Sequence, residues 1–166
     1  MILNLTGTCD MAKIGVSTKY ILREEDGIPY MPEEIPRETL DEMLQAEADV
    51  VEPEIVKNAN TLLRGPYWTG TTAKAVKRKR PVYARDSQGG RVRELLVTFA
   101  GVREDEHHRK TTKESDRRNA AIAFINEYGN KKTEARAFMA KAVDEKEAEA
   151  QDAGEAVFDK WLNKNM

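Results

Sequence analysis

The sequence predicts an α+β fold: a long N-terminal helix, a short helix, a β-hairpin-based antiparallel sheet and a long C-terminal helix. Two stretches carry apolar residues at helical spacing, one over 40–63 and one over 139–161. Between them, two β-prone runs flank a turn that contains Gly89 and Gly90. With 166 residues, 40% hydrophobic and 34% charged, the chain is expected to form a single domain over 37–166 with its own core and a highly charged surface.

Residues 1–36 are expected to form a flexible N-terminal arm. Pro29, Pro32 and Pro36 interrupt this segment, Gly27 marks a turn, and its apolar residues are isolated from one another. Such an extension is either disordered or ordered only against a neighbouring subunit.

The first long helix is predicted to begin at Thr39. Thr39 and Glu42 have the spacing of a capping box, in which the hydroxyl and the carboxylate satisfy free backbone N–H groups. Pro53 lies inside the apolar pattern, so we expect either a kink or two abutting helices. The apolar face consists of Leu40, Met43, Leu44, Val51, Ile55, Ala59, Leu62 and Leu63.

The segment after this helix contains a stop signal and then a new start. Gly65 and Pro66 are expected to end the long helix. Thr69 and Gly70 then offer an N-cap for a short helix that runs to about Val76.

A β-hairpin is predicted next. Its strands are expected within 76–84 and 91–99, on either side of the turn cluster 86–90. The second run is more apolar near its end and is expected to lie deeper in the sheet, whereas Pro81 favours an edge position for the first run.

The C-terminal half begins with a polar loop. Residues 103–118 contain no aliphatic or aromatic side chain, and we predict a mobile loop that becomes ordered on assembly. The segment 120–128 is compatible with a helix or a buried strand; Asn119 as a cap and Gly129 as a helix end favour a short helix. The last helix is predicted from about Ala135 to Leu162, with an apolar face of Met139, Val143, Ala150, Ala153, Val157 and Trp161.

No residue pattern indicates an enzyme or a cofactor. His107 and His108 have acidic neighbours but no third His or Cys at ligand spacing, so a solvated loop is expected there and no metal site. Cys9 has no histidine near it in sequence, and a single cysteine cannot form an internal disulfide. Phosphate-loop, dinucleotide-binding, hydrolase and zinc-protease motifs are all absent from the sequence. With no signal peptide or stretch of transmembrane length, we expect assembly in the cytosol and no membrane contact.

Charge is strongly segregated along the chain. Residues 1–63 carry 5 Lys or Arg against 13 Asp or Glu, residues 64–118 carry 15 against 7, and residues 119–166 carry 7 against 9. The basic surface is expected to include Lys74, Lys77, Arg78, Lys79, Arg80, Arg85, Arg91 and Arg93. Alternation along a strand can align Arg78 and Arg80 with bases of the second strand, which suits phosphate neutralisation.

Three interpretations of this basic surface remain open. It can bind nucleic acid, although the sequence pI of about 5.8 and the lack of aromatic residues alternating with the bases count against this. It can protect an exposed sheet edge against unwanted pairing. It can also line the channel of a ring or meet the acidic first helix of the next subunit.

Two short motifs resemble those of a known family. The run Asn126 to Gly129 (NEYG) follows an apolar segment and is followed, after a basic turn, by Ala135 to Phe138 (ARAF). This is similar to the "fvEyG…arPF" signature of tailed-phage morphogenesis proteins, described as tail-component, tail-completion or head–tail joining proteins. The upstream run Gly65 to Gly70 (GPYWTG) resembles the "P-x-x-T-G" of the same family. The resemblance covers roughly Thr39 to Leu162, and it departs from the family at Ala137, where the signature has proline.

The resemblance implies a non-enzymatic structural protein of a tailed phage or prophage, located in the virion and assembled in the host cytoplasm. It implies a homo-oligomeric ring, of six subunits, that completes the upper end of the tail or joins it to the head. Head-connector and tail-tube proteins would be its neighbours, with DNA able to pass through a channel. The alternative function is a basic-surface nucleic-acid-binding adaptor. Candidate residues for turns or subunit interfaces are Trp68, Thr69, Gly70, Glu127, Tyr128, Gly129, Arg136 and Phe138.

Within the second motif, Glu127 is expected to be partly buried, with Arg136 as its partner. The alternative is that both side chains are exposed, in which case the pair contributes only about 0–1 kcal/mol.

Overall fold

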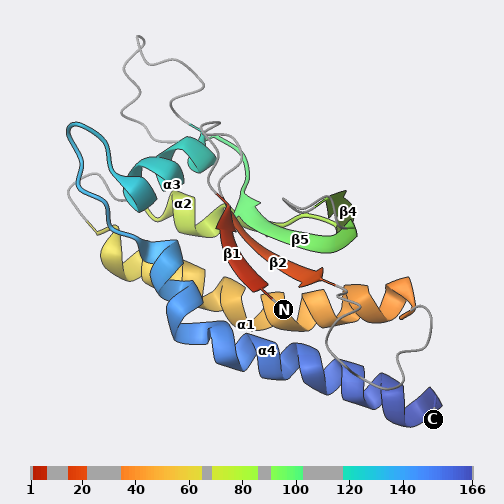
Figure 1. Ribbon diagram of the computed structural model, residues 1–166. Coiled ribbons are helices and arrows are strands. Elements are labelled where there is room, and N and C mark those ends of the chain that lie inside the picture. The colour runs from red at the N-terminus through yellow and green to blue at the C-terminus, as the bar shows by residue number, and fades with distance from the viewer. Residues whose placement is uncertain are drawn as a thin grey trace.

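The protein forms two layers, an antiparallel sheet and a pair of long helices (Figure 1). This computed structural model describes residues 2–6, 15–21, 35–64, 69–85, 91–102 and 118–165. The layers confirm the predicted α+β class, with helices α1 (Arg37–Leu62) and α4 (Phe138–Asn165) at the two ends of the helical part of the sequence. Four expected features lie wholly or partly outside the described residues: the loop 103–118 apart from Arg118, the turn cluster 86–90, the motif residues 65–68, and the arm apart from residues 2–6, 15–21 and 35–36.

The sheet has the strand order β1-β2-β5-β3, and β4 also pairs with β5. Each of these pairs is antiparallel. The strands are β1 (Ile2–Thr6), β2 (Gly15–Ile21), β3 (Val76–Arg78), β4 (Val82–Arg85) and β5 (Arg91–Phe99).

The predicted hairpin is confirmed as the pair β4–β5, in register from Val82 opposite Glu94 to Arg85 opposite Arg91. β3 pairs with the other half of β5, where Val76 lies opposite Phe99. Because β5 has β2 on one side and β3 and β4 on the other, it occupies the interior position that its apolar sequence predicts. Pro81 lies between β3 and β4, at a break in the edge where no ladder hydrogen bond is lost.

The expectation of an arm over 1–36 is wrong for two of its segments. β2 pairs along its whole length with β5, and β1 pairs with β2, so both belong to the sheet of their own chain. The distant strand β5, which pairs with β2, lies more than 70 residues away along the chain, and a local pattern cannot show this pairing. β1 joins the sheet only through β2.

Helix α1 begins two residues earlier than predicted. Its N-cap is Pro36, which makes no side-chain cap, and Thr39 is buried in the first turn, so the predicted capping box is wrong. The helix continues through Pro53, which excludes two separate helices. Pro53 and Asp49 are both exposed, so water can hydrate the Asp49 carbonyl that loses its intrahelical donor.

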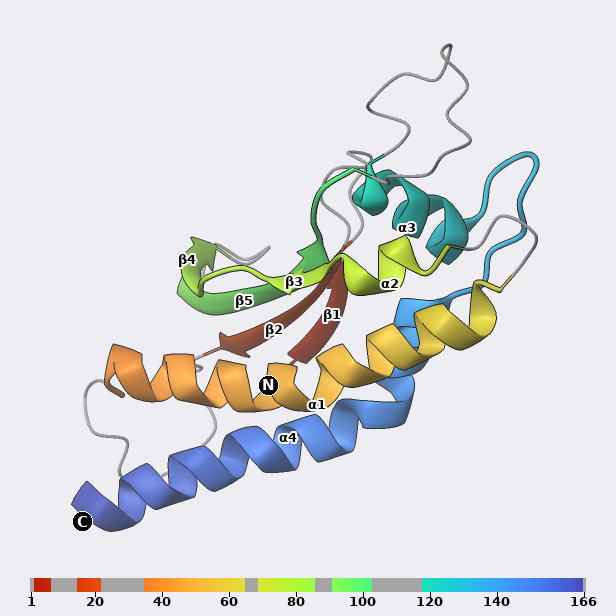
Figure 2. The same ribbon diagram turned by 180° about the vertical axis from the view of Figure 1, so that it is seen from behind.

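The two long helices run antiparallel, side by side beneath the sheet (Figure 2). Alanines 48, 59, 142 and 150 are completely buried and let the helix backbones approach each other. The main core is shared by α1, β5, α3 and α4, and a smaller cluster joins the start of α1 to the end of α4. The main cluster includes Leu44, Val51, Ile55, Leu95, Val97, Phe99, Phe138 and Met139.

The two short helices lie at one end of the sheet. α2 (Thr71–Lys74) and α3 (Asn119–Tyr128) confirm both predicted short helices, although α2 ends before Val76, where β3 begins. The side chain of Asn119 joins the two segments, donating to the Ala100 carbonyl at 2.9 Å and accepting from the Thr72 hydroxyl at 3.5 Å. Within the described part of the chain, no helix has the length and apolar character needed to span a membrane.

Candidate functional site

The second motif forms the junction between α3 and α4. Gly129 ends α3 with a φ of 76°, and its N–H donates to the Ile125 carbonyl at 2.8 Å. A Cβ at this position would lie 2.8 Å from the Ala135 nitrogen and 2.9 Å from the Thr133 oxygen. Both the conformation and the close approach of the returning chain therefore require glycine.

Glu127 caps α4 from the preceding helix. Its side chain is 3% exposed, and its two carboxylate oxygens accept hydrogen bonds from the N–H groups of Met139 at 2.8 Å and Ala140 at 3.0 Å. These amides belong to the first turn of α4 and have no partner within that helix. Burial raises the pKa of Glu127 above its ordinary value, while the backbone donors oppose this rise. A carboxylate here also faces the positive end of the α4 dipole.

The expected burial of Glu127 is confirmed, and its expected partner is wrong. Arg136 is exposed, and its guanidinium donates to the Leu62 carbonyl at 3.3 Å. The backbone N–H of Arg136 donates to the Asn126 carbonyl at 2.7 Å, which aligns the returning chain with the end of α3. The buried carboxylate is therefore satisfied by backbone amides, which carry no sequence signature.

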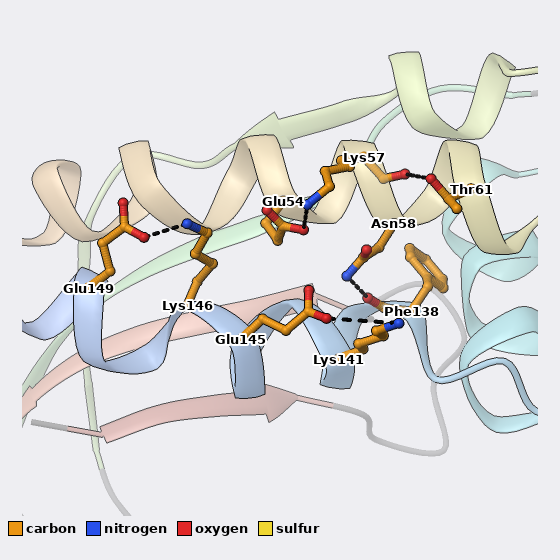
Figure 3. Close-up of polar contacts among 9 residues, drawn as sticks. All are labelled: Glu54, Lys57, Asn58, Thr61, Phe138, Lys141, Glu145, Lys146 and Glu149. Carbon is orange, nitrogen blue, oxygen red and sulfur yellow. Dashed lines mark hydrogen bonds and ion pairs between the residues drawn. The ribbon is translucent and has the colours of Figure 1, made fainter.

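Ala137 and Phe138 complete the junction. Ala137 has a φ of 45°, which the proline of the family signature cannot adopt because its ring fixes φ near −65°. Phe138 is completely buried, and its ring lies edge-on to Phe99 with the centroids 6.0 Å apart. Asn58 reaches across from α1 to the Phe138 carbonyl at 3.4 Å (Figure 3). These contacts fix the start of α4 against α1 and β5.

The remaining motif residues lie at a turn or on the surface. Gly70 is the N-cap of α2 with a φ of 74°, and the hydroxyls of Thr69 and Thr71 lie 2.6 Å apart. Trp68 lies outside the described residues. Tyr128 is 43% exposed and packs on Phe124, with ring centroids 4.9 Å apart.

Two residues of the predicted basic surface are used inside the chain. Arg93 is 3% exposed and binds both carboxylate oxygens of Asp41 on α1, at 2.7 and 2.9 Å. Its guanidinium also lies 4.5 Å from the centroid of the Tyr83 ring. Arg78 binds Asp49 at 2.6 Å and also binds Glu52, both on α1. These arginines attach the sheet to α1 and are not available for phosphate, so the predicted basic surface is wrong at these two positions.

The other described bases form a surface that we call the cationic edge. Each has an exposed side chain and no ion pair to another described residue. Val82 and Tyr83, which are 54% and 44% exposed, lie among them on β4. The side chain of Arg91 lies outside the described residues. The cationic edge consists of Lys74, Lys77, Lys79, Arg80 and Arg85.

Sequence reasoning missed two features of these sites. Tyr83 supplies an aromatic ring beside the bases, and the alternation of Val82 and Ala84 with Tyr83 and Arg85 is the signal that indicates it. Glu47 on α1 is 0% exposed, and both of its carboxyl oxygens lack a hydrogen-bond partner among the described residues. Burial raises the pKa of Glu47 to about 8.

Gly154 of α4 makes room for Glu47. A Cβ on Gly154 would lie 2.6 Å from Oε1 of Glu47. No local sequence pattern indicates this pair, because the two residues meet only when α1 and α4 pack together. Within the described residues, no group of three or more His, Cys, Asp or Glu is arranged to hold a metal ion.

Comparison of this chain with protein-family profiles, with curated proteins and with solved structures finds no match.

Proposed function

We propose that this chain is a non-enzymatic structural protein of a tailed phage or prophage, located at the head–tail junction of the virion. In this proposal it assembles in the host cytoplasm into a ring of six subunits, between head-connector and tail-tube proteins. The resemblance of its two motifs to those of tail-completion and head–tail joining proteins is the basis of the proposal.

The observation that supports it is the convergence of the second motif on one structural junction. Glu127 caps α4, Gly129 allows the turn, and Phe138 fills the core between α1 and β5. Each of these residues shapes the chain, and none presents a reactive group to solvent. This arrangement is expected of a sequence motif whose residues fix the local backbone structure of a protein that assembles with others.

The two carboxyl groups with raised pKa values fit a structural role better than a catalytic one. A general acid or base must reach the proton that it transfers. Glu47 is sealed between two helices, and both oxygens of Glu127 are occupied by backbone amides.

Inactivation of the gene in the phage or prophage that carries it tests the proposal. We expect filled heads and tails that remain separate, counted by negative-stain electron microscopy, with joined particles restored by the wild-type gene. Normal yields of joined, infectious particles without the protein would contradict the proposal. Light scattering of the purified protein tests the ring independently, and a mass of one subunit at every concentration would argue against unassisted assembly.

The cationic edge favours a second candidate function, a nucleic-acid-binding adaptor. Its five bases have no ion pair among the described residues, and an exposed tyrosine lies beside them. If all five contact phosphates, the slope of log affinity against log salt is about −4.5, so binding to duplex DNA falls steeply with salt. A fluorescence anisotropy titration at several salt concentrations measures this slope, and a slope near zero would exclude the adaptor.

A further inference from the structure

The outer side of α4 carries a surface that we call the acidic face. It consists of Asp144, Glu147, Asp152, Glu155 and Asp159. All five side chains are exposed, and none has an ion pair to another described residue. Their spacing keeps them on one side of the helix, opposite the buried positions Met139, Ala142 and Ala150 that face the core. Two further acids of α4, Glu145 and Glu149, are paired with Lys141 and Lys146 and lie outside this face.

Helix α4, which carries the acidic face, and the strands β3 and β4, along which the cationic edge runs, lie on opposite sides of α1 (Figures 1 and 2). One chain therefore cannot bring its own two surfaces together. The acids of α1 that lie nearest the sheet are already engaged, since Asp41 binds Arg93 and Asp49 and Glu52 bind Arg78. The exposed acids of α1 without an ion pair to another described residue are Glu38 and Glu42, whereas α4 offers five such acids.

The two surfaces also match in length and in number of charges. The acidic face extends from residue 144 to residue 159, about 22 Å along a helix. The cationic edge follows β3 and β4, which together span β5 from Arg91 to Phe99, about 26 Å along a strand. The two surfaces thus have similar lengths and five charges each, although Lys77 (opposite Thr98) and Arg85 (opposite Arg91) leave opposite faces of the sheet along its edge. Val82 and Tyr83 supply apolar surface on the cationic side.

We propose that the cationic edge of one subunit docks on the acidic face of α4 of the next subunit. This contact joins two different surfaces of identical chains, so it repeats head to tail and closes into a ring if the rotation between neighbours permits. The inference rests on the self-assembly in the proposed function and names the two surfaces that would perform it.

A pair of charge-reversed variants tests this contact. Lys77→Glu/Arg80→Glu leaves the cationic edge with three bases and two acids, and Asp152→Lys/Glu155→Lys leaves the acidic face with three acids and two bases. Each variant alone is expected to self-associate about tenfold or more weakly than the wild type, because the reversed side chains meet charges of their own sign and most of the net attraction between the two surfaces is lost. An equimolar mixture is expected to recover assembly, since every contact in an alternating assembly pairs opposite charges. The measurement is mass by light scattering and sedimentation velocity at low and moderate salt.

The control is Lys131→Glu/Lys132→Glu, which makes the same change in net charge at an exposed turn between α3 and α4. It is expected to assemble as the wild type does. Circular dichroism and thermal melts establish that all the variants are folded.

Three outcomes would overturn the inference. The first is a wild-type protein that remains a monomer at high concentration and low salt. The second is normal assembly of each charge-reversed variant on its own. This result would leave the proposed ring intact but would place its interface elsewhere. The third is loss of duplex DNA binding in Lys77→Glu/Arg80→Glu with unchanged self-association, which would assign the cationic edge to nucleic acid.

Discussion

Glu47 is the residue whose environment conflicts most with its chemistry. Its carboxyl group is neutral in the folded protein at pH 7, because burial raises its pKa to about 8, but it ionises near its ordinary pKa of 4.5 when the chain unfolds. The folded state therefore binds more protons than the unfolded state between these two values, so this group makes folding less favourable as the pH rises from 4.5 to about 8. At pH 7 the cost is about 3 kcal/mol.

Glu47→Gln removes this ionisation and keeps the size of the side chain. We expect the variant to be more stable than the wild type at pH 7 by about 3 kcal/mol, with the difference shrinking towards pH 5. Urea unfolding between pH 5 and pH 9 measures it. The matched control is Glu42→Gln, an exposed position on the same helix, for which stability should change little. A constant difference between wild type and Glu47→Gln across this pH range would contradict the assignment.

Ala137 carries backbone strain at the start of α4. A side chain at a φ of 45° costs about 1–2 kcal/mol, which glycine avoids at the expense of a more flexible unfolded chain. Ala137→Gly is therefore expected to stabilise the protein by about 0.5–1 kcal/mol, seen as a higher Tm.

The same position distinguishes the chain from the family signature. Ala137→Pro is expected to destabilise the protein by about 3 kcal/mol or more, since proline cannot adopt this φ. The control for Ala137→Gly is Ala135→Gly. Ala135 has no positive φ, so glycine there relieves no strain and only makes the unfolded chain more flexible. A stable Ala137→Pro variant would show that the junction adopts the family's turn instead.

At the scale of elements, the junction between α3 and α4 depends on one carboxylate. Glu127→Ala leaves the amides of Met139 and Ala140 without their acceptor in a buried site. We expect a loss of about 2–4 kcal/mol of stability, from two hydrogen bonds to a charged group. Glu134→Ala is the control, since Glu134 is exposed in the same connection. Hydrogen exchange should show faster exchange at the first turn of α4 in Glu127→Ala, and unchanged exchange there would contradict the capping role.

The elements also show what the sequence can predict and what it cannot. The helices with apolar residues at regular spacing and the pairing of β4 with β5 follow from local patterns and are confirmed. The strands β1 and β2 were not predicted, because β2 pairs with β5, which is distant in the sequence, and β1 joins the sheet only through β2. The start of α1 was misplaced because burial of Thr39 in the first turn overrides its preference for a cap position.

The candidate site divides in the same way. The turn at Gly129 was predictable because only glycine fits that backbone conformation. The partners of Arg78 and Arg93 were not, because each binds a carboxylate on α1, which precedes β3 and β5 by many residues. Glu127 was predicted to be partly buried. Its hydrogen-bond donors could not be predicted, because they are backbone N–H groups whose position depends on the path of the chain and not on residue type.

At the scale of the whole molecule, two arginines attach the sheet to α1, and they differ in burial. Asp41→Ala leaves the buried Arg93 guanidinium without its carboxylate, and we expect a loss of about 2–3 kcal/mol, since Asp41 itself is partly exposed to solvent. Asp49→Ala removes an exposed partner of Arg78, which keeps Glu52, and should cost less than about 1 kcal/mol. Unfolding by heat or by urea, which adds no salt, measures the loss of stability in both variants. Equal losses for the two variants would contradict a buried anchor at Arg93.

The strand order has a consequence for synthesis on the ribosome. β1 and β2 are translated before β5 and can pair with each other, but the other edge of β2 has no partner until β5 has been translated, and Phe138 fills the core later still. These two strands are therefore among the last elements to reach their final structure, and the unpaired edge of β2 is open to aggregation during that interval. A chain that stops before β5 would lose the sheet as well as α4, so nascent fragments of this protein are natural clients for chaperones.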